Sequence, residues 1–331
     1  MRACVLHEIK QPLQIEERSN LQPGEGEVVV RLKAASLNRR DYWITQDLYP
    51  GIELPCVLGS DGVGVVSSVG ANVEERWLGQ EVILDAGMDW GDDEAAQAAE
   101  FSVLGMPVDG TFADEVVVRA DQLHPKPAHL DWASAATLPV AGVTAYRAIF
   151  RQGQLKEGET ILITGVGGGV AAFALQFAVA AGAKVWVTSS SEEKIRKAVE
   201  LGALGGFDYR EESWAKQFVA EAGAPHLILD SAGGSSYAQL VKIAAPGGRI
   251  VNCGSTTGAP DGLDLFKVFW KQLHLVGSSL GSPVDFTNML EFVGHHKIEP
   301  LVDATYPLVE VNTALESMKN SPQFGKIVLT T

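Results

Sequence analysis

The segment Ile161–Ala183, ILITGVGGGVAAFALQFAVAAGA, has 23 residues without a charge, and a glycine cluster lies where its apolar run becomes a helical pattern. The next segment, Lys184–Thr188 (KVWVT), predicts a second strand. Strand, glycine turn, helix and strand within about 30 residues is the order of a dinucleotide-binding βαβ unit. The glycines let the backbone approach a pyrophosphate, and free N–H groups at the helix start hold its charge. The segment therefore predicts a nucleotide-binding α/β unit.

Two other interpretations of this segment are possible. An uncharged run of this length is long enough to span a bilayer. However, Gly165 and the cluster Gly167–Gly169 would break the helix near its start, Gln176 lies inside it, and no basic flank marks a cytoplasmic side. The other alternative is a buried βα unit that binds nothing, because a glycine motif alone is weak support for a nucleotide site.

Length and charge narrow the possible classes of protein. With 331 residues, two domains are expected, and 46% hydrophobic residues with 35 glycines suit a globular α/β enzyme. The net charge of −15 argues against nucleic acid or an anionic membrane as a partner. The N-terminal residues MRACVLHEIKQP lack an apolar signal region, which predicts a cytoplasmic protein. Cys4, Cys56 and Cys253 are far apart, so they predict neither a disulfide framework nor a cysteine-rich zinc site.

The first 125 residues are rich in strand patterns, whereas the segment from Thr160 to about Ser279 alternates strands with helices, which predicts a doubly wound parallel sheet. Asp85–Asp109 is acidic and broken by glycines, so we expect a surface excursion there. Prolines near Leu123 predict a domain junction.

In the second part of the chain, Ser190 with Glu193 predicts a helix N-cap. The expected strands of the first part are Glu27–Lys33, Gly62–Val69, Glu81–Leu84 and Asp114–Arg119; those of the second are ILIT, KVWVT, LILDS, RIVNCG and LHLVGSS, with helices at Val170–Ala181, Ser191–Leu201, Glu212–Ala222 and Tyr237–Ile243, and the tail GKIVLT returns to the first domain.

Six motifs are spread over nearly the whole chain: Ser36–Asp41 (SLNRRD), Leu58–Gly70 (LGSDGVGVVSSVG), Gly110–Val118 (GTFADEVVV), Leu138–Tyr146 (LPVAGVTAY), the glycine turn and Gly325–Leu329 (GKIVL). Together they resemble the medium-chain dehydrogenase/reductase superfamily. The resemblance implies an α/β protein with a β-rich GroES-like catalytic domain at 1–127 and 280–331 and a Rossmann NADPH-binding domain at 128–279. It also implies a small-molecule substrate and a homodimer, with a tetramer as the alternative.

The superfamily divides by zinc, and this chain resembles its zinc-independent branch, which includes quinone oxidoreductases. Where zinc alcohol dehydrogenases have cysteine, histidine and cysteine ligands, this chain has Asn38, Ser60 and Val140. These residues do not supply the nitrogen and sulfur donors of a catalytic zinc site. The structural-zinc lobe of relatives has four cysteines, and Asp85–Asp109 has none. His295–His296, in a polar stretch, is interpreted as a solvated helix end and not as a metal site.

The residues after the second strand favour NADPH over NADH. NAD-preferring sites place an acidic residue about 20 residues after the glycines. Here the strand ends in Ser189–Ser191, whose hydroxyls suit a 2′-phosphate, and Lys194 adds a positive charge. Ser190, Lys194 and Tyr209 match the small residue, lysine and tyrosine that quinone oxidoreductase relatives use for this phosphate. The alternative is that Lys194 is a solvated helix lysine whose positive field is weakened by the neighbouring Glu192 and Glu193.

The resemblance also implies contacts around the nicotinamide and the pyrophosphate. Loops that follow successive parallel strands lie at one edge of a sheet, where ligands bind. We interpret Asp230 as a residue that orders its strand end, and Cys253 as a small buried residue and not a nucleophile. The expected cofactor contacts besides those above are Thr144, Gly167, Gly168, Gly169, Val170, Cys253, Gly254, Ser255, Ser278 and Ser279.

Without zinc, hydride addition to an activated alkene or a quinone needs only a hydrogen-bond donor for the developing oxygen charge and a source of a proton. The candidate catalytic residues are Asn38, Tyr42, Tyr49 and Ser60. The Asn38 amide donates hydrogen bonds, and the two tyrosines either donate a proton or form an aromatic pocket. Asp41 is expected to anchor its loop and not to transfer a proton.

The leading hypothesis is therefore an NADPH-dependent reductase of quinones or of α,β-unsaturated carbonyls, including enones, alkenals and enoyl thioesters. One alternative is an alcohol or aldehyde dehydrogenase of the same superfamily. The other is a non-catalytic NADPH-binding sensor or partner protein.

Overall fold

The computed structural model describes residues 1–319 and 323–331. Contacts divide the chain into two units, Met1–Ala141 with Ser282–Thr331, and Gly142–Gly281. The first boundary lies at Ala141 and not at the expected residue 127, because helix α2, Trp132–Ala136, packs against strands β3 and β5 of the first unit. The return to the first unit at Ser282 is within two residues of the expected position.

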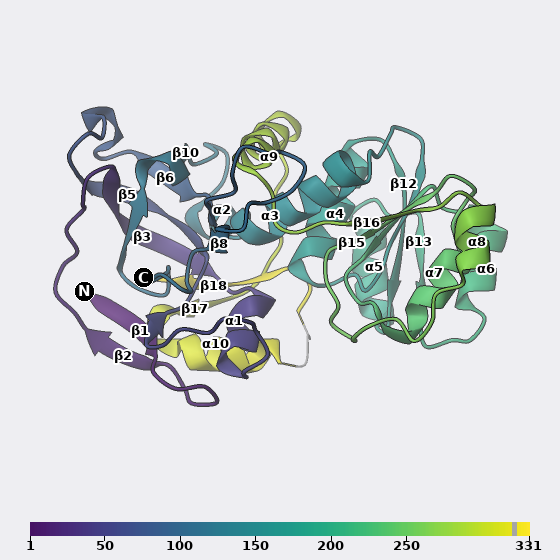
Figure 1. Ribbon diagram of the computed structural model, residues 1–331, viewed down its shortest axis with the longest axis horizontal. Helices are drawn as coiled ribbons and strands as arrows, with labels where there is room; N and C mark the ends of the chain where they lie inside the picture. Colours follow the sequence, from purple (N-terminus) through teal and green to yellow (C-terminus); the bar gives the residue numbers. More distant parts are fainter. Residues whose placement is uncertain (320–322) are drawn as a thin grey trace. The chain divides into compact units, whose positions relative to one another are not determined.

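The first unit is built on a mostly antiparallel sheet with the order β10-β6-β5-β3-β18-β17, in which β9 also pairs with β3 (Figure 1). The predicted strands are all present, and the C-terminal strand β18 returns to pair with β3 as expected. A second, three-stranded sheet has the order β2-β1-β4. The bounds are β1 Arg2–Leu6, β2 Gln14–Glu17, β3 Glu27–Ser36, α1 Arg39–Thr45, β4 Cys56–Val57, β5 Asp61–Val69, β6 Glu81–Leu84, β9 Glu115–Arg119, β10 Leu123–Pro125, α2 Trp132–Ala136, α9 Pro283–His296, β17 Val302–Pro307, α10 Val311–Met318 and β18 Lys326–Thr330.

The expectation that Asp85–Asp109 is only a surface excursion was wrong. Trp90, Leu104 and Met106 are buried, and Leu104 belongs to the same hydrophobic cluster as Val28 of β3 and Val66 of β5. A short hairpin of β7, Gly87–Met88, and β8, Ser102–Val103, folds the segment back so that its few large apolar residues face inward. These residues could not be recognised as core residues from the sequence, because they are single apolar residues in an acidic segment and follow no regular period.

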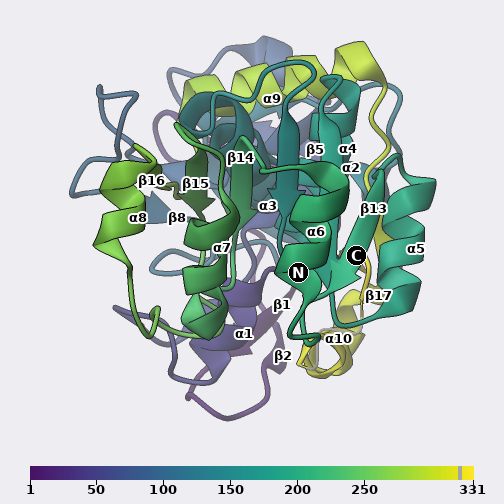
Figure 2. The same cartoon turned by 90° about the vertical axis from the view of Figure 1, so that its right-hand side faces the viewer.

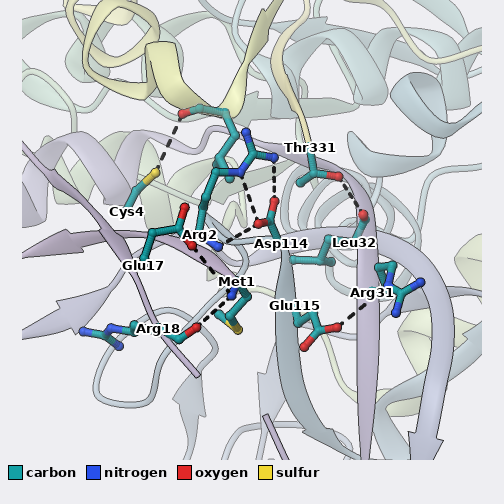
Figure 3. Close-up of polar contacts among 11 residues, drawn as sticks. Met1, Arg2, Cys4, Glu17, Arg18, Arg31, Leu32, Asp114, Glu115 and Thr331 are labelled. Atoms are coloured by element: carbon teal, nitrogen blue, oxygen red, sulfur yellow. Dashed lines mark hydrogen bonds and ion pairs between the residues drawn. The ribbon is translucent and has the colours of Figure 1, made fainter. Parts of the chain in front are cut away.

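The two ends of the chain are fastened to the first unit by polar contacts (Figure 3). The Arg2 guanidinium donates to both carboxylate oxygens of Asp114, from Nη2 at 2.8 Å and from Nε at 3.1 Å. Burial alone would raise the pKa of Asp114, but the hydrogen bonds from Arg2 outweigh it and hold the pKa below its usual value. At the other end, Thr331 Oγ1 donates to the Leu32 carbonyl at 2.6 Å.

The second unit is a six-stranded parallel sheet with the order β13-β12-β11-β14-β15-β16, which confirms the predicted doubly wound α/β fold. Helices α6 and α7 cover one face, where Trp186 points, and α5 brings Ile195 against Val187 on the opposite face (Figure 2). Strand β13 was not predicted, because its sequence GGFD has low strand propensity. The bounds are α3 Pro139–Tyr146, β11 Thr160–Ile163, α4 Gly169–Ala180, β12 Lys184–Ser189, α5 Glu192–Glu200, β13 Gly205–Asp208, α6 Trp214–Ala222, β14 Leu227–Asp230, α7 Tyr237–Ile243, β15 Arg249–Asn252, α8 Leu265–Trp270 and β16 His274–Gly277.

The uncharged segment that could have spanned a bilayer is divided between β11, the glycine turn and the 12-residue helix α4. Within residues 1–319 and 323–331, no helix is long and apolar enough to cross a membrane. His295 and His296 are exposed at the last turn of α9, as predicted for a solvated helix end.

Candidate active site

The glycine turn has the backbone geometry that a dinucleotide site needs. Gly165 and Gly167 have φ values of +62° and +136°, and α4 begins directly afterwards at Gly169. The Thr188 side chain accepts a hydrogen bond from the Gly165 N–H at 3.1 Å, which ties the turn to β12. A methyl group added at Gly165 or Gly168 would meet no atom within 4 Å, so the outer surface of the turn is open. These residues fit the pyrophosphate of a dinucleotide, whose charge the first N–H groups of α4 would hold.

The serines, the lysine and the tyrosine predicted to bind a 2′-phosphate lie at one edge of the sheet. Strands β12 and β13 are neighbours, with Ser189 opposite Asp208, and the Tyr209 N–H donates to the Ser189 carbonyl at 3.4 Å. Tyr209 is exposed, and Lys194 lies in the first turn of α5. No acidic residue ends β12 itself, and the carboxylate of Asp208, at the end of β13, is paired with the guanidinium of Arg210 at 2.5 Å.

The predicted N-cap at Ser190 was wrong by one residue. The hydroxyl of Ser191 caps α5 by accepting from the Lys194 N–H at 3.4 Å. The Ser191 N–H in turn donates to Ser189 Oγ at 3.2 Å, so both of these serines stabilise the turn. The side chain of Ser190 makes no hydrogen bond within the described part of the chain, which leaves it available to a ligand.

The ends of β14, β15 and β16 lie at the same edge of the sheet, and Asp230 is the last residue of β14. Asp230 accepts hydrogen bonds from Thr164 Oγ1 at 2.6 Å, from the Gly233 N–H at 2.8 Å and from Asn252 Nδ2 at 3.1 Å, which confirms that it orders its strand end. Burial of the thiol raises the pKa of Cys253 to about 12, which keeps the thiol protonated and fits the expectation that it is not a nucleophile; the residue as a whole is only partly buried, and not buried as expected. The other predicted contacts lie in the same unit, with Thr144 in α3, Gly254 and Ser255 after β15, and Ser278 and Ser279 after β16.

In the first unit, the start of α1 brings together most of the predicted catalytic residues. The carboxylate of Asp41 accepts from the Asn38 N–H at 2.7 Å, which confirms that Asp41 anchors the start of this helix. Its side chain is fully buried, and burial raises the pKa of Asp41 to about 6 in spite of the nearby positive charge of Arg40.

Lys326 of β18 connects two of these residues across the sheet. Its ammonium donates to Asn38 Oδ1 at 2.6 Å and to Asp61 Oδ2 at 2.8 Å, and Lys326 and Asp61 are almost fully buried. The other carboxylate oxygen of Asp61 accepts from the Val140 N–H at 2.8 Å. Asn38, Ser60 and Val140, the positions at which zinc relatives carry metal ligands, therefore lie around one buried ion pair.

Arg40 completes this cluster. Its Nη1 donates to Ser60 Oγ at 2.6 Å and to the Leu104 carbonyl at 2.9 Å, and its Nη2 donates to the Met106 carbonyl at 3.3 Å. The ring of Tyr49 lies over the guanidinium, 5.1 Å from its carbon. Sequence reasoning missed both Arg40 and Lys326, because a basic residue next to a motif or in a tail strand carries no local sign of burial.

These residues do not fit a metal ion. The Asn38 oxygen and the Ser60 hydroxyl are bonded to two cations, Lys326 and Arg40, and Val140 has no donor atom in its side chain. In the part of the chain that the structure describes, no group of three histidine, cysteine or acidic residues is placed to hold a metal. A divalent cation at this place would have weak ligands and two positive neighbours.

Tyr42 is not part of this cluster. Its electrostatic partners are Arg39 and Lys319, and it lines a separate cavity of about 240 Å³. The cavity is lined by Lys10, Gln11, Pro12, Leu13, Tyr42, Thr45, Gln46, Asn312, Leu315 and Glu316. The structure thus places Ser60 and Tyr49 against Arg40 and Asn38 against Lys326, whereas Tyr42 lines the cavity and packs on the same hydrophobic cluster as Tyr49.

Comparison with known proteins identifies the family. The family model of the alcohol dehydrogenase GroES-like domain matches residues 24–128, and the model described as zinc-binding dehydrogenase matches residues 169–295. The zinc-type alcohol dehydrogenase-like protein YogA of Leptosphaeria maculans is 35% identical over 96% of this chain and 94% of its own length. The chain belongs to the medium-chain dehydrogenase/reductase superfamily. Its first unit is the GroES-like β domain of this superfamily, and its second is the Rossmann domain.

Relatives within the superfamily differ in their reactions. The acryloyl-coenzyme A reductase of Metallosphaera sedula is 30% identical, and the match covers the whole of both chains. Among solved structures, an NAD-dependent alcohol dehydrogenase has a TM-score of 0.93 and 33% identity over the whole of both chains. The crotonyl-CoA carboxylase/reductase AntE V350A, in complex with NADP, has a TM-score of 0.89 and 25% identity over 100% of this chain and 95% of its own.

Proposed function

We propose that this oxidoreductase uses NADPH to reduce a quinone or an α,β-unsaturated carbonyl compound, and that it does so without zinc. The observation that carries the proposal is the bonding at two ligand positions of the zinc enzymes: Asn38 is held by Lys326, and Ser60 is held by Arg40. A metal that polarises an alcohol has no ligands there, whereas a conjugated carbonyl needs only hydrogen-bond donors.

The residues of this chain would act by binding and by holding charge. The bound dinucleotide supplies a hydride. Lys326 fixes the Asn38 oxygen, so the Asn38 amide N–H groups face away from Lys326 and can donate to a substrate oxygen. Tyr49 forms an aromatic wall over Arg40, against which a flat conjugated substrate could lie. The proton that completes the reaction comes from water or from a tyrosine hydroxyl, and hydride transfer itself depends chiefly on positioning.

Preference for NADPH is supported by the edge formed by β12 and β13. The Ser190 hydroxyl, Lys194 and the exposed Tyr209 lie there. The carboxylate of Asp208 is paired with Arg210, whereas Glu192 and Glu193 next to Lys194 weaken its positive field. The AntE structure, whose complex holds NADP, supports the same choice, whereas the NAD-dependent alcohol dehydrogenase favours NADH.

The related acyl-coenzyme A reductases favour an enoyl thioester among the possible substrates. Alcohol or aldehyde dehydrogenation is the second candidate, because several relatives bear that name. A non-catalytic NADPH sensor is the third. Each candidate predicts a different result in a single assay series.

The test is NADPH oxidation by the purified protein with quinones, alkenals, enones and enoyl thioesters, together with metal analysis. We expect turnover of at least one conjugated carbonyl or quinone, unchanged by a chelator, and no stoichiometric zinc. Chelator-sensitive oxidation of an alcohol with bound zinc would identify the second candidate, and NADPH binding without turnover of any compound would identify the third.

We also propose that the protein is a homodimer that acts on a small molecule and binds neither nucleic acid nor membranes. The net charge of −15 opposes binding to polyanions. The exposed aromatic side chains of α8, Phe266, Phe269 and Trp270, lie beside the edge strand β16 and support association with a second copy.

A further inference from the structure

Although the Asp41 carboxyl lies close enough to feel its charge, Arg40 is a buried cation with no direct ion pair in the described residues. Its side chain belongs to a residue that is only 8% exposed, and the three acceptors that it bonds, Ser60 Oγ and the Leu104 and Met106 carbonyls, are all neutral. None of the ion pairs in the described residues involves Arg40, and its Nε–H has no hydrogen-bond partner. Burial of a charge without a direct ion pair is costly, and an anion held in this cluster would offset part of that cost.

Asn38 presents a second unused donor in the same cluster. Because a lysine ammonium has donors and no acceptor, the contact of 2.6 Å with Lys326 identifies the Asn38 oxygen and fixes the amide orientation. The Nδ2 group therefore lies on the other side of the amide, where it is buried and has no partner among residues 1–319 and 323–331. Asn38 is 7% exposed, so this unpaired group is also unfavourable in the protein alone.

Ser60 supplies a third donor. Arginine, like lysine, can only donate, so Ser60 Oγ acts as the acceptor in its 2.6 Å contact with Arg40. The hydroxyl proton of Ser60 then remains to be donated, and no acceptor for it is found among the residues that the structure describes. The bond from Arg40 also polarises this hydroxyl and strengthens it as a donor.

We infer that Asn38, Arg40 and Ser60 form an oxyanion site, in which the fixed charge of Arg40 takes the place of a metal and holds the carbonyl oxygen of the substrate. The donors of Asn38 and Ser60, beside the charge of Arg40, match an oxygen that gains negative charge, and Asp41 Oδ1 is a buried acceptor at the same helix start that also has no partner among the described residues. Asn38 and Ser60 contact the oxygen through their own hydrogen atoms, and Arg40 acts on it through its charge and through the bond that it donates to Ser60 Oγ. The inference rests on the proposed reduction of a conjugated carbonyl.

The electron balance of the step agrees with this arrangement. The hydride forms a C–H bond at the β-carbon, the C=C electron pair shifts to the bond between the α-carbon and the carbonyl carbon, and the C=O pair moves onto oxygen. The dinucleotide is oxidised and the alkene is reduced. A proton from water then binds the α-carbon, the enolate oxygen becomes a carbonyl again, and the donors release it. The donors bond the enolate oxygen more strongly than the carbonyl oxygen, which is the condition for catalysis.

Entry of the oxygen requires a movement within the cluster. The unpaired nitrogen atoms of Asn38 and Arg40 are closed off from solvent, so bulk water does not serve as their acceptor. Tyr49 is only partly buried and its ring covers the guanidinium, so a displacement of this ring would open the donors to a flat ligand.

The test uses 4-nitrophenol, a flat probe whose oxygen is conjugated as an enolate oxygen is, and whose phenolate absorbs visible light. The full-length protein is titrated with the probe, with NADP⁺ present, at a pH where the probe is mostly neutral in water. We expect the wild-type protein to bind the phenolate, seen as a rise in visible absorbance. Arg40→Met should weaken phenolate binding about 10²-fold, the scale of one lost oxyanion donor, and Arg40→Lys should retain part of it.

Arg39→Met is the matched control. Arg39 precedes Arg40 in α1 but donates to the Met318 carbonyl at 3.0 Å, outside the cluster, so this variant should bind the probe as the wild type does. Thermal unfolding of each variant shows whether it is folded. Absence of phenolate binding by the wild-type protein, or equal binding by a folded Arg40→Met variant, overturns the inference.

The same variants separate the inference from the proposed function. If a conjugated carbonyl is reduced, Arg40→Met should lower kcat and kcat/KM together by about 10²-fold, because the lost contact acts in the transition state. Turnover that is unaffected by Arg40→Met would overturn the oxyanion site and leave the proposed function standing. Phenolate binding that depends on Arg40, without turnover of any compound, would support the site and contradict the proposed reaction.

Discussion

At the scale of single residues, the choice between NADPH and NADH depends on a few side chains that follow β12. Lys194 lies in the first turn of α5, four residues after Ser190, and Tyr209 follows the neighbouring strand β13. A 2′-phosphate placed there would accept a charge-assisted hydrogen bond from the lysine, whereas the 2′-hydroxyl of NADH would not. We therefore expect Lys194→Ala to weaken NADPH binding by roughly 1–3 kcal/mol and to leave NADH binding almost unchanged.

Fluorescence titration with each dinucleotide measures this difference. Lys197→Ala is the control, because Lys197 lies one turn further along α5 and pairs with Glu193 at 3.0 Å. An equal loss of affinity for both dinucleotides in Lys194→Ala would contradict the assignment, and so would an equal effect of the control substitution.

At the scale of elements, three glycines allow the loop that carries two acceptors of Arg40 to lie close to the strand end before Ser60. A Cβ atom at Gly110 would lie 2.0 Å from the Gly59 carbonyl oxygen, and one at Gly105 would lie 2.3 Å from it. Leu104 and Met106, whose carbonyls accept from Arg40, flank Gly105. The Gly59 carbonyl belongs to the backbone and cannot rotate away from the new Cβ atom, so Gly110→Ala must displace the loop that contains it.

We expect Gly110→Ala to destabilise the protein by about 1–3 kcal/mol or more and to reduce phenolate binding at the Arg40 cluster. Gly294→Ala in α9 is the control, because its Cβ would meet no atom and a helical alanine is favoured by about 0.5–1 kcal/mol. Chemical denaturation of both variants gives the comparison. A Gly110→Ala variant as stable as Gly294→Ala would show that the close approach is unimportant.

The elements also show what the sequence can and cannot predict. The glycine turn was predictable because its strand, turn and helix signals are all local, and β13 was missed because Gly205 and Gly206 carry no strand signal. The absence of zinc ligands could be read directly at Asn38 and Ser60. The bonds that these residues make were not predictable, because Lys326 reaches Asn38 only through the pairing of β18 with β3, 288 positions away in the sequence.

At the scale of the whole molecule, the exposed edge of the parallel sheet determines how two copies could associate. Strand β16 ends the sheet, so one side of its backbone has no strand partner, and Leu275 on it is 37% exposed. In α8, just before it, Phe266 and Trp270 are 60% and 72% exposed and stack on each other with ring centroids 5.8 Å apart. A twofold axis beside β16 would pair this edge with its own copy and cover the aromatic rings in both chains.

We therefore expect the wild-type protein to be a dimer and the double substitution Phe266→Glu with Trp270→Glu to produce a monomer, because two added charges per chain would face the same charges across the axis. Light scattering coupled to gel filtration measures the mass. Leu204→Glu is the control: Leu204 is 58% exposed beside β13, at the opposite end of the same sheet, and its substitution should leave the dimer intact. A wild-type protein that is a monomer would contradict this prediction. So would a dimer that is dissociated by Leu204→Glu and not by the α8 variant.

Since each chain carries a net charge of −15, the dimer should also be weaker at low salt, where the repulsion between copies is least screened.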